Sequence, residues 1–256
     1  MSEAKKRKKR AMTSQKASFV KKQGHLDAKE FAKLIGLQDD YQNDPKAKKD
    51  VIDFNGDGHS LKSGKGYWQV FLYGKSRFDT DSAFKAMNGI GQIMLQCINT
   101  IPNDKTEYEA NKKYYKQQLS LQMIELCKKF DEKYRVEQFL RKSIFEGTQV
   151  SYLTIKHNDI FHVFWHDDVI EVFLQYLTIA NSTGENGPQK VLFKLNGKNC
   201  GEIEMRNGED SHHKEMKFRL HKVKITNLLI DKITNKTYYN EKICVYGKAI
   251  KKFLKK

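Results

Sequence analysis

The chain is poor in the residues that build covalent or metal-held scaffolds. Its four cysteines, at positions 97, 127, 200 and 244, lie far apart and form no Cys-x-x-Cys motif. This spacing argues against a zinc ribbon and against a disulfide framework, and it is typical of a reducing compartment. Walker and dinucleotide-binding glycine motifs are also missing, so the sequence gives no support to chemistry driven by a bound nucleotide.

Long apolar runs are absent as well. No stretch approaches the roughly 18 consecutive apolar residues of a membrane helix, and the N-terminus lacks the apolar segment of a signal peptide. We therefore expect a cytoplasmic protein with no membrane partner. Histidines occur at 157, 162 and 166 and at 212 and 213, but they fall in strand-like segments, so a zinc centre with about four convergent ligands is not favoured.

Acidic residues are outnumbered by basic ones. The chain has 31 Asp and Glu against 47 Lys and Arg, a net charge of +16. Residues 1–22 hold nine basic residues against Glu3 alone, so +8 lies in this segment and 16 − 8 leaves +8 for the rest. Such an excess indicates a polyanionic partner. We predict that residues 1–22 form a disordered basic arm that adds salt-dependent affinity for phosphates.

A pair of glycine turns stands early in the chain between two short β-type runs. Asn55-Gly56-Asp57-Gly58 contains residues that tolerate positive φ, which favours a tight reversal there. On the second strand Ser60 and Lys62 share a face, because side chains alternate along a strand. The pattern places an aspartate of the first strand beside Lys62, and it leaves open whether this is Asp50 or Asp53.

An aspartate and a lysine on adjacent strands are two of the groups that phosphodiester cleavage needs. The reaction requires a carboxylate to hold a divalent cation, a developing hydroxide, and positive charge near the water or the phosphate. Mg²⁺ prefers oxygen ligands and keeps several waters, so one or two carboxylates suffice to hold it against a substrate phosphate.

These residues resemble the active-site hairpin of the PD-(D/E)XK nucleases. The similarity lies in Asp50-Val51-Ile52, the turn, and a strand ending in Lys62-Ser63. Within that superfamily, residues 60–65, 68–74 and 76–78, together with 201–206 and 210–212, are similar to a group of bacterial type II restriction endonucleases. The resemblance implies Mg²⁺-dependent, sequence-specific cleavage of double-stranded DNA. It also implies a homodimer and a cognate DNA methyltransferase as genetic partner.

The resemblance also implies roles for particular residues. Asp50 would hold the metal, Lys62 would position or activate the water, and Gln69 would assist. Ser60 stands where the family has Glu or Asp, so it is a departure within the catalytic set. A second carboxylate must then come from elsewhere, and the candidates are Asp57, Glu30, Asp53, Glu202 and Glu204.

Asp57 and Glu30 are the candidates we predict as metal ligands beside Asp50. Glu202 and Glu204 share one face of a predicted strand, so the Asp50 hairpin is not the sole possible catalytic centre. A solvated strand face is the competing interpretation of that glutamate pair.

Candidate DNA contacts lie in two regions. Lys65 and Arg77 follow the hairpin and are suited to phosphate. Arg or Lys reads guanine and Asn or Gln reads adenine in the major groove, so the later candidates for base contacts are Arg206, Asn207, Asn181 and Gln189.

We predict an α/β (α+β) fold with a mixed central sheet flanked by helices, a restriction-endonuclease-like core and a β-rich C-terminal half. Residues 23–148 form the catalytic half, and residues 149–256 form a target-reading half packed with it as one globular unit. Asp27 and Glu30 indicate a helix start and Gly36 its end. Further helices are predicted over 80–97 and 106–145, and strands at 150–155, 160–165, 191–195, 200–206 and 214–223.

Two alternative functions remain open at this point. A structure-selective nuclease such as a junction resolvase would use the same chemistry. A basic nucleic-acid-binding protein without catalysis would explain Ser60 as the mark of a dead site.

Overall fold

The computed structural model describes residues 14–38, 50–64, 66–87, 89–206 and 213–254. Two residues that we predicted as DNA contacts, Lys65 and Asn207, lie outside the described residues. So do residues 1–13 of the predicted arm.

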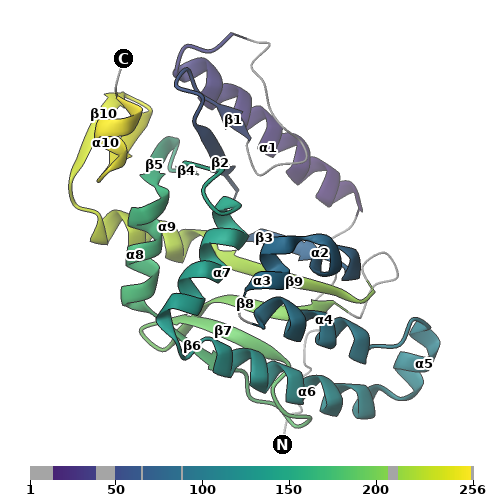
Figure 1. The fold of residues 1–256 in the computed structure, drawn as a ribbon. Helices are drawn as coiled ribbons and strands as arrows, with labels where there is room; N and C mark the ends of the chain where they lie inside the picture. Colours follow the sequence, from purple (N-terminus) through teal and green to yellow (C-terminus); the bar gives the residue numbers. More distant parts are fainter. Residues whose placement is uncertain (1–13, 39–49, 65, 88, 207–212, 255–256) are drawn as a thin grey trace, which may run out of the picture.

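Two sheets organise the chain, one above the other in Figure 1. The first has six strands in the order β1-β2-β4-β5-β11-β10. It is mixed, because β2 runs parallel to β4 and β11 parallel to β5, whereas the other neighbouring strands are antiparallel. Its strands are β1 (Val51–Ile52), β2 (Gly58–Lys62), β4 (Tyr152–His157), β5 (Ile160–Trp165), β10 (Lys236–Asn240) and β11 (Ile243–Tyr246).

The second sheet has five antiparallel strands in the order β3-β9-β8-β7-β6. These are β3 (Tyr67–Tyr73), β6 (Leu177–Asn181), β7 (Lys190–Leu195), β8 (Lys198–Arg206) and β9 (Glu215–His221). Each sheet combines strands from both sides of residue 148, so that position does not separate two sheets.

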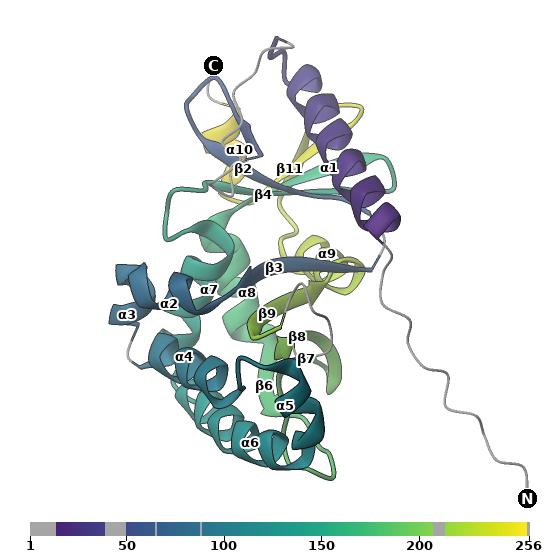
Figure 2. The same ribbon diagram turned by 90° about the vertical axis from the view of Figure 1, so that its right-hand side faces the viewer.

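Helices flank both sheets, as predicted. They are α1 (Ser14–Leu34), α2 (Lys75–Thr80), α3 (Ser82–Ala86), α4 (Ile90–Thr100), α5 (Lys105–Ala110), α6 (Lys112–Lys129), α7 (Lys133–Phe145), α8 (His166–Tyr176), α9 (Lys222–Lys232) and α10 (Ala249–Phe253). Figure 2 shows α4 and α6 on one side of the five-stranded sheet. The predicted α+β class with a central sheet between helices is confirmed.

The central strands of the six-stranded sheet are largely buried, whereas the edge strand β10 is mostly exposed. Phe31 of α1 and Phe253 of α10 pack with Tyr152 and Val163 on one face, in the smaller of two apolar clusters. Residues such as Leu153, on the other face, belong to the larger cluster, which continues to the helices that cover the five-stranded sheet. Alternate side chains of one strand therefore support two cores.

Helix α1 begins earlier than the sequence suggested. It starts at Ser14, so residues 14–22 are helical, and the prediction of a disordered arm is wrong for them. The predicted capping role of Asp27 is also wrong, because Asp27 lies in the middle of the helix and is buried. The predicted end at Gly36 is confirmed: its φ is +88°, and the N–H of Leu37 bonds to the carbonyl of Ala32 at 2.9 Å.

The helix predicted over 80–97 is divided into α3 and α4. Asp81 caps α3 by accepting the N–H groups of Ala83 and Phe84. Gly89 then takes a φ of +85° at the break. A Cβ on Gly91 would lie 2.1 Å from the carbonyl oxygen of Phe84, so α3 and α4 approach each other through a position that only glycine fits.

The C-terminal half contains every predicted strand, and its first hairpin turns at Asn158 and Asp159, which have φ of 51° and 58°. The same half also contains α8, α9 and α10, which we did not predict. It is therefore β-rich, as predicted, with three helices among its strands. In the part before it, the region predicted as one or two helices over 106–145 is divided into α5, α6 and α7.

Candidate functional site

The predicted reversal is present, with β1 and β2 paired antiparallel. Asp53 holds the turn, since its Oδ1 accepts the N–H groups of Asn55 at 2.9 Å and Asp57 at 3.0 Å. Its Oδ2 lies 3.3 Å from Nε2 of His59. Asp53 is thus committed to the turn, and this decides which aspartate is available to Lys62.

His59 fixes the hairpin to the sheet below the turn. Its ring is fully buried, and its Nδ1 lies 2.9 Å from the hydroxyl of Thr154 on β4. Burial lowers the pKa of His59 despite the neighbouring Asp53 carboxylate. The ring is therefore neutral, and it can donate from Nε2 to Asp53 while Nδ1 accepts the hydroxyl of Thr154.

Asp50 and Lys62 lie side by side at the other end of the hairpin. Their side chains approach to 3.6 Å between Oδ2 and Nζ, with 42% and 22% of their surfaces exposed. The N–H of Leu61 donates to the same carboxylate oxygen at 2.7 Å, which orients the carboxylate. Because β1 is an edge strand, the pair stands at the rim of the six-stranded sheet. The juxtaposition of an aspartate and Lys62 is what the sequence predicted.

Ser60 and Gln69 do not join this pair in the roles we expected. Ser60 is fully buried, and its hydroxyl has no hydrogen-bond partner among the described residues. Gln69 belongs to the other sheet, where it is exposed and pairs in register with Arg219 of β9. The chain crosses from one sheet to the other between Lys62 and Tyr67.

The predicted metal ligands Asp57 and Glu30 are engaged elsewhere. Asp57 accepts the hydroxyls of Ser151 at 2.6 Å and Tyr152 at 3.4 Å. Glu30 pairs with Lys156 at 2.5 Å. Across the described parts of the chain, no three His, Cys, Asp or Glu side chains form a group that could hold a metal ion.

The set Asp50, Asp57 and Glu30 is therefore not assembled as one metal site. Asp50 alone stands beside the lysine. A single half-exposed carboxylate fits Mg²⁺ only as a cation shared with substrate phosphate oxygens and water, which is a common way for proteins to hold it.

Asp27 and Lys222 are polar residues near the pair whose importance the sequence did not indicate. Burial opposes ionisation of Asp27, but hydrogen bonds with Ser63, Lys156 and Gln23 outweigh it and lower its pKa. This ties α1 to the residue that follows Lys62. Lys222 is buried, which lowers its pKa, and its Nζ donates to the carbonyl of Lys156 at 2.7 Å.

The sequence signal for Asp27 was its spacing of three residues from Glu30, which predicted a helix start and not a buried contact inside the helix. Lys222 carried no sequence signal. Its backbone N–H bonds to the carbonyl of Gly66 at 2.7 Å, one step beyond the pair Tyr67–His221 that joins β3 to β9.

Glu202 and Glu204 belong to an ion-pair network on the five-stranded sheet. Glu202 is 4% exposed and accepts Nε of Arg219 at 2.7 Å and Nζ of Lys190 at 3.1 Å. Glu204 pairs with Lys190 and Lys217. Burial opposes ionisation of Glu204, but these two lysines outweigh it and lower its pKa. Both carboxylates are surrounded by cations, an arrangement that favours ion pairs over a metal site.

Of the predicted DNA contacts that are described, Arg77 and Gln189 have protein partners for their side chains. Arg77 pairs with Asp81 at 3.2 Å and with Glu146 at 3.3 Å. Asn181 lies opposite the fully buried Val191, and its Oδ1 is buried without a hydrogen-bond partner in the described chain. Arg206 pairs in register with Glu215, and Gln189 donates to the carbonyl of Lys116 at 2.8 Å.

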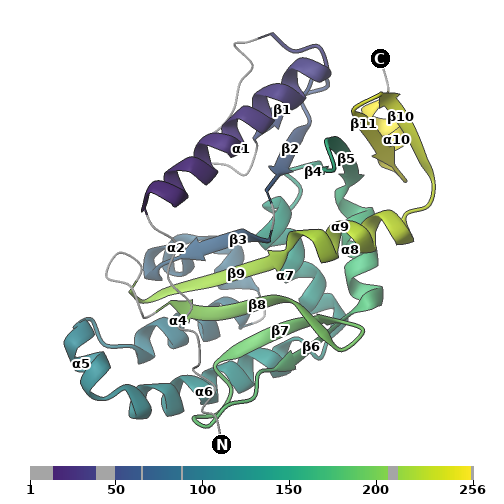
Figure 3. The ribbon, with the colours of Figure 1, turned by 180° about the vertical axis from the view of Figure 1, so that it is seen from behind.

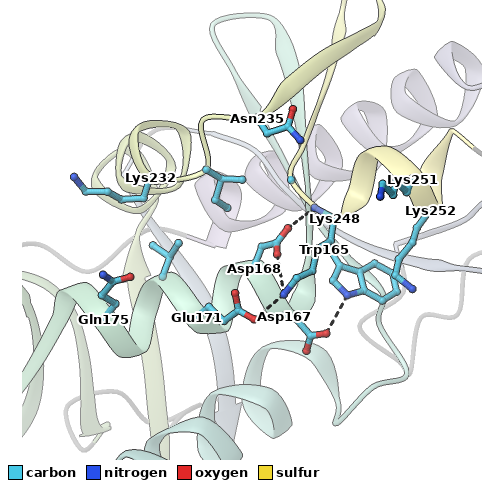
Figure 4. A pocket seen from close by; sticks show the side chains of 13 residues that line it. Trp165, Asp167, Asp168, Glu171, Gln175, Lys232, Asn235, Lys248, Lys251 and Lys252 are labelled. Atoms are coloured by element: carbon cyan, nitrogen blue, oxygen red, sulfur yellow. Dashed lines mark hydrogen bonds and ion pairs between the residues drawn. The ribbon is translucent and has the colours of Figure 1, made fainter.

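Two hollows lie away from the pair. One, of about 680 Å³, is bounded by α8, α10 and the segment before β10 (Figure 4). Lys248 pairs with two of its acids: it donates to Glu171 at 2.6 Å and lies 3.4 Å from Asp168. The other, of about 810 Å³, is lined by Phe54 at the hairpin tip and by Tyr238, among others. Neither includes Asp50 or Lys62.

None of the described helices is long and apolar enough to cross a membrane. No family model, curated protein or solved structure matches the chain. What can be said of function therefore depends on the residues and geometry above.

Proposed function

We propose that this protein is an Mg²⁺-dependent endonuclease that cuts double-stranded DNA, with Asp50 and Lys62 as its catalytic pair. The observation that supports it most is the 3.6 Å approach of a half-exposed carboxylate and an ammonium group on adjacent strands at a sheet rim. A second support is the net charge of +16, which suits a polyanionic substrate.

Each residue has a role that follows from its position. Asp50 would hold the Mg²⁺ ion, which when bound supplies Lewis acidity and a more acidic water. Leu61 keeps the Asp50 carboxylate in one orientation through its N–H. Lys62 places a positive charge beside that carboxylate, where it can orient the attacking water and stabilise negative charge that develops on the phosphate.

The finer assignment comes from the resemblance of the hairpin and of residues 201–206. It favours a type II restriction endonuclease that acts as a homodimer on a short DNA sequence in the bacterial cytoplasm, beside a cognate methyltransferase. A structure-selective nuclease would use the same Asp50 and Lys62, and its substrate preference separates the two.

A nucleic-acid-binding protein without catalysis is the second candidate. Two observations favour it: Ser60 is buried where the family has a carboxylate, and Asp50 has no second acidic residue with it in a metal-binding group of the described chain.

The test is incubation of supercoiled plasmid with the purified protein in MgCl₂ or in EDTA. We expect discrete linear fragments with Mg²⁺ and none with EDTA or with the Asp50→Asn variant. Asp131→Asn, which changes an exposed aspartate far along the chain, is the matched control and should cut like the wild type. Cleavage of branched DNA alone would favour a resolvase, and retardation of DNA without any cleavage would favour the binding protein.

A further inference from the structure

In the first half of α1, none of the side chains that the structure describes is buried in a core. Burial along the helix begins at Asp27 and Ala28 and continues through Phe31, Ala32 and Ile35 just beyond its end. The side chains described before Asp27 are exposed or half-exposed, including Phe19 at 67% and Leu26 at 51%. A helical segment of about a dozen residues without tertiary support is marginal in water. Figure 3 shows this half of α1 extending away from β1 and β2.

A row of lysines runs along the exposed side of the same helix. Lys22, Lys29 and Lys33 are all exposed. Their spacing of seven and four residues places them within about 40° of one another around the axis and over about 16 Å of its length. Buried Phe31 lies on the opposite side. The three ammonium groups thus face solvent in one line.

The charge of this row is uncompensated by the described residues. None of the three lysines makes a hydrogen bond or ion pair with another described side chain or backbone group. The acids of α1 are Asp27 and Glu30, and both pair with Lys156 of β4. The sequence before α1 continues the same charge, with Lys5, Lys6, Arg7, Lys8, Lys9 and Arg10.

We infer that the row Lys22, Lys29 and Lys33 binds the phosphate backbone of duplex DNA. One strand of B-DNA carries a phosphate about every 3.4 Å along the axis, so a line of about 16 Å spans several phosphates. Lysine ammonium groups act as point charges on flexible stems. The row therefore supplies affinity without reading sequence, and a bound duplex stabilises the unsupported half of α1.

An anionic membrane fits this helix less well. A membrane-surface helix buries an apolar face and carries its lysines on the other side. Here the apolar face, with Ala28, Phe31 and Ile35, is already buried in the protein. The exposed Phe19 and Leu26 lie on the same side as the lysines, so they do not form a separate apolar face.

This backbone site is separate from the proposed catalytic pair. Asp27, on the inner side of α1, bonds to Ser63 next to Lys62, so the lysine row points away from β2. The inference thus goes beyond the nuclease proposal and does not depend on it. The row contributes to DNA affinity and its salt dependence and takes no part in bond cleavage.

The test is fluorescence anisotropy with a labelled 30-base-pair duplex in EDTA across a KCl series. The variant carries Lys22→Gln, Lys29→Gln and Lys33→Gln. The matched control carries Lys113→Gln, Lys128→Gln and Lys133→Gln, three exposed lysines of α6 and α7. Circular dichroism and urea unfolding confirm that both variants fold.

The slope of log K against log[KCl] should become shallower by up to about 3 in the α1 variant, since each phosphate contact contributes roughly 0.9. At 0.1 M KCl this corresponds to an affinity loss of up to about 500-fold. The control should bind DNA like the wild type.

Unchanged binding in the α1 variant, or an equal loss in the control, overturns the inference. So does a stronger effect of the α1 variant on binding to phosphatidylserine vesicles, on duplex RNA or on self-association than on DNA. Failure of the nuclease proposal looks different: wild-type protein would bind DNA through this row and cut nothing.

Discussion

Replacing Glu202 tests whether the charged residues of the five-stranded sheet form a stabilising ion-pair network or bind a metal ion. If it is the anion of an ion-pair network, replacing it costs stability; if it is a metal ligand, replacing it costs activity and leaves the fold intact. The perturbation is Glu202→Ala, which leaves Arg219 and Lys190 without the carboxylate that both contact.

The magnitude follows from burial. Removing one partner of a fully buried ion pair costs about 3–5 kcal/mol. Glu202 is 4% exposed, but the side chains of Arg219 and Lys190 are 29% and 33% exposed and regain water. We therefore expect a cost at or just below the lower limit of that range, about 2–3 kcal/mol, or a fall in Tm of about 4–12 °C for a chain of this size.

The assay is equilibrium unfolding in urea followed by circular dichroism. Glu171→Ala is the matched control, since Glu171 pairs with Lys248 at a largely exposed position, and exposed pairs contribute about 0–1 kcal/mol. A Glu202→Ala protein as stable as the wild type but unable to bind Mg²⁺ would refute the ion-pair explanation.

Two further predictions concern packing and pH. Gly91→Ala should destabilise the protein by about 1–3 kcal/mol in urea unfolding, because its Cβ would overlap the carbonyl of Phe84. The control Gly24→Ala, with open space in α1, should stabilise the protein by about 0.5–1 kcal/mol. Equal effects of the two substitutions would contradict the close approach of α3 and α4 at Gly91. Burial lowers the pKa of His162 to about 4, so the unfolded chain binds a proton that the folded one does not as pH falls from about 6.5 to about 4. Over this pH range the free energy of unfolding should drop by up to about 3 kcal/mol. Unfolding of His162→Gln across the same pH range should show a smaller drop. An identical pH dependence in the variant would contradict the lowered pKa of His162.

The hairpin was predictable because its cause is local. Asn-Gly and Asp-Gly favour one kind of turn wherever they stand, and two short runs flank them. The choice between Asp50 and Asp53 was not predictable from alternation. It depends on the Asp53 carboxylate, which accepts N–H groups of the turn and contacts a histidine fixed by Thr154 of β4.

Asp27 shows that the same spacing of two acidic residues occurs both at a helix start and inside a helix. An acid followed three residues later by glutamate is typical of a helix start, yet here both acids lie inside a helix and face Lys156, which is more than a hundred residues away in sequence. Only the folded sheet brings that lysine to them, so the sequence near Asp27 could not reveal it.

Gln69 and α8 illustrate a second kind of limit. Gln69 follows Lys62 closely in sequence but lies on the other sheet, because β3 pairs with β9 from late in the chain. Helix α8 has β-branched residues such as Val169 and Ile170 and no side-chain cap. Burial against β4 and β5 stabilises it, and propensity alone favours a strand.

The central claim is that Lys62 acts on the phosphate beside Asp50. Single-turnover cleavage of plasmid DNA at saturating protein tests it most directly, with Lys62→Ala compared to Lys236→Ala, an exposed lysine of edge strand β10. The account predicts a rate at least about 100-fold lower for Lys62→Ala, with DNA affinity in EDTA nearly unchanged and Lys236→Ala like the wild type. Cleavage by Lys62→Ala at the wild-type rate would contradict it.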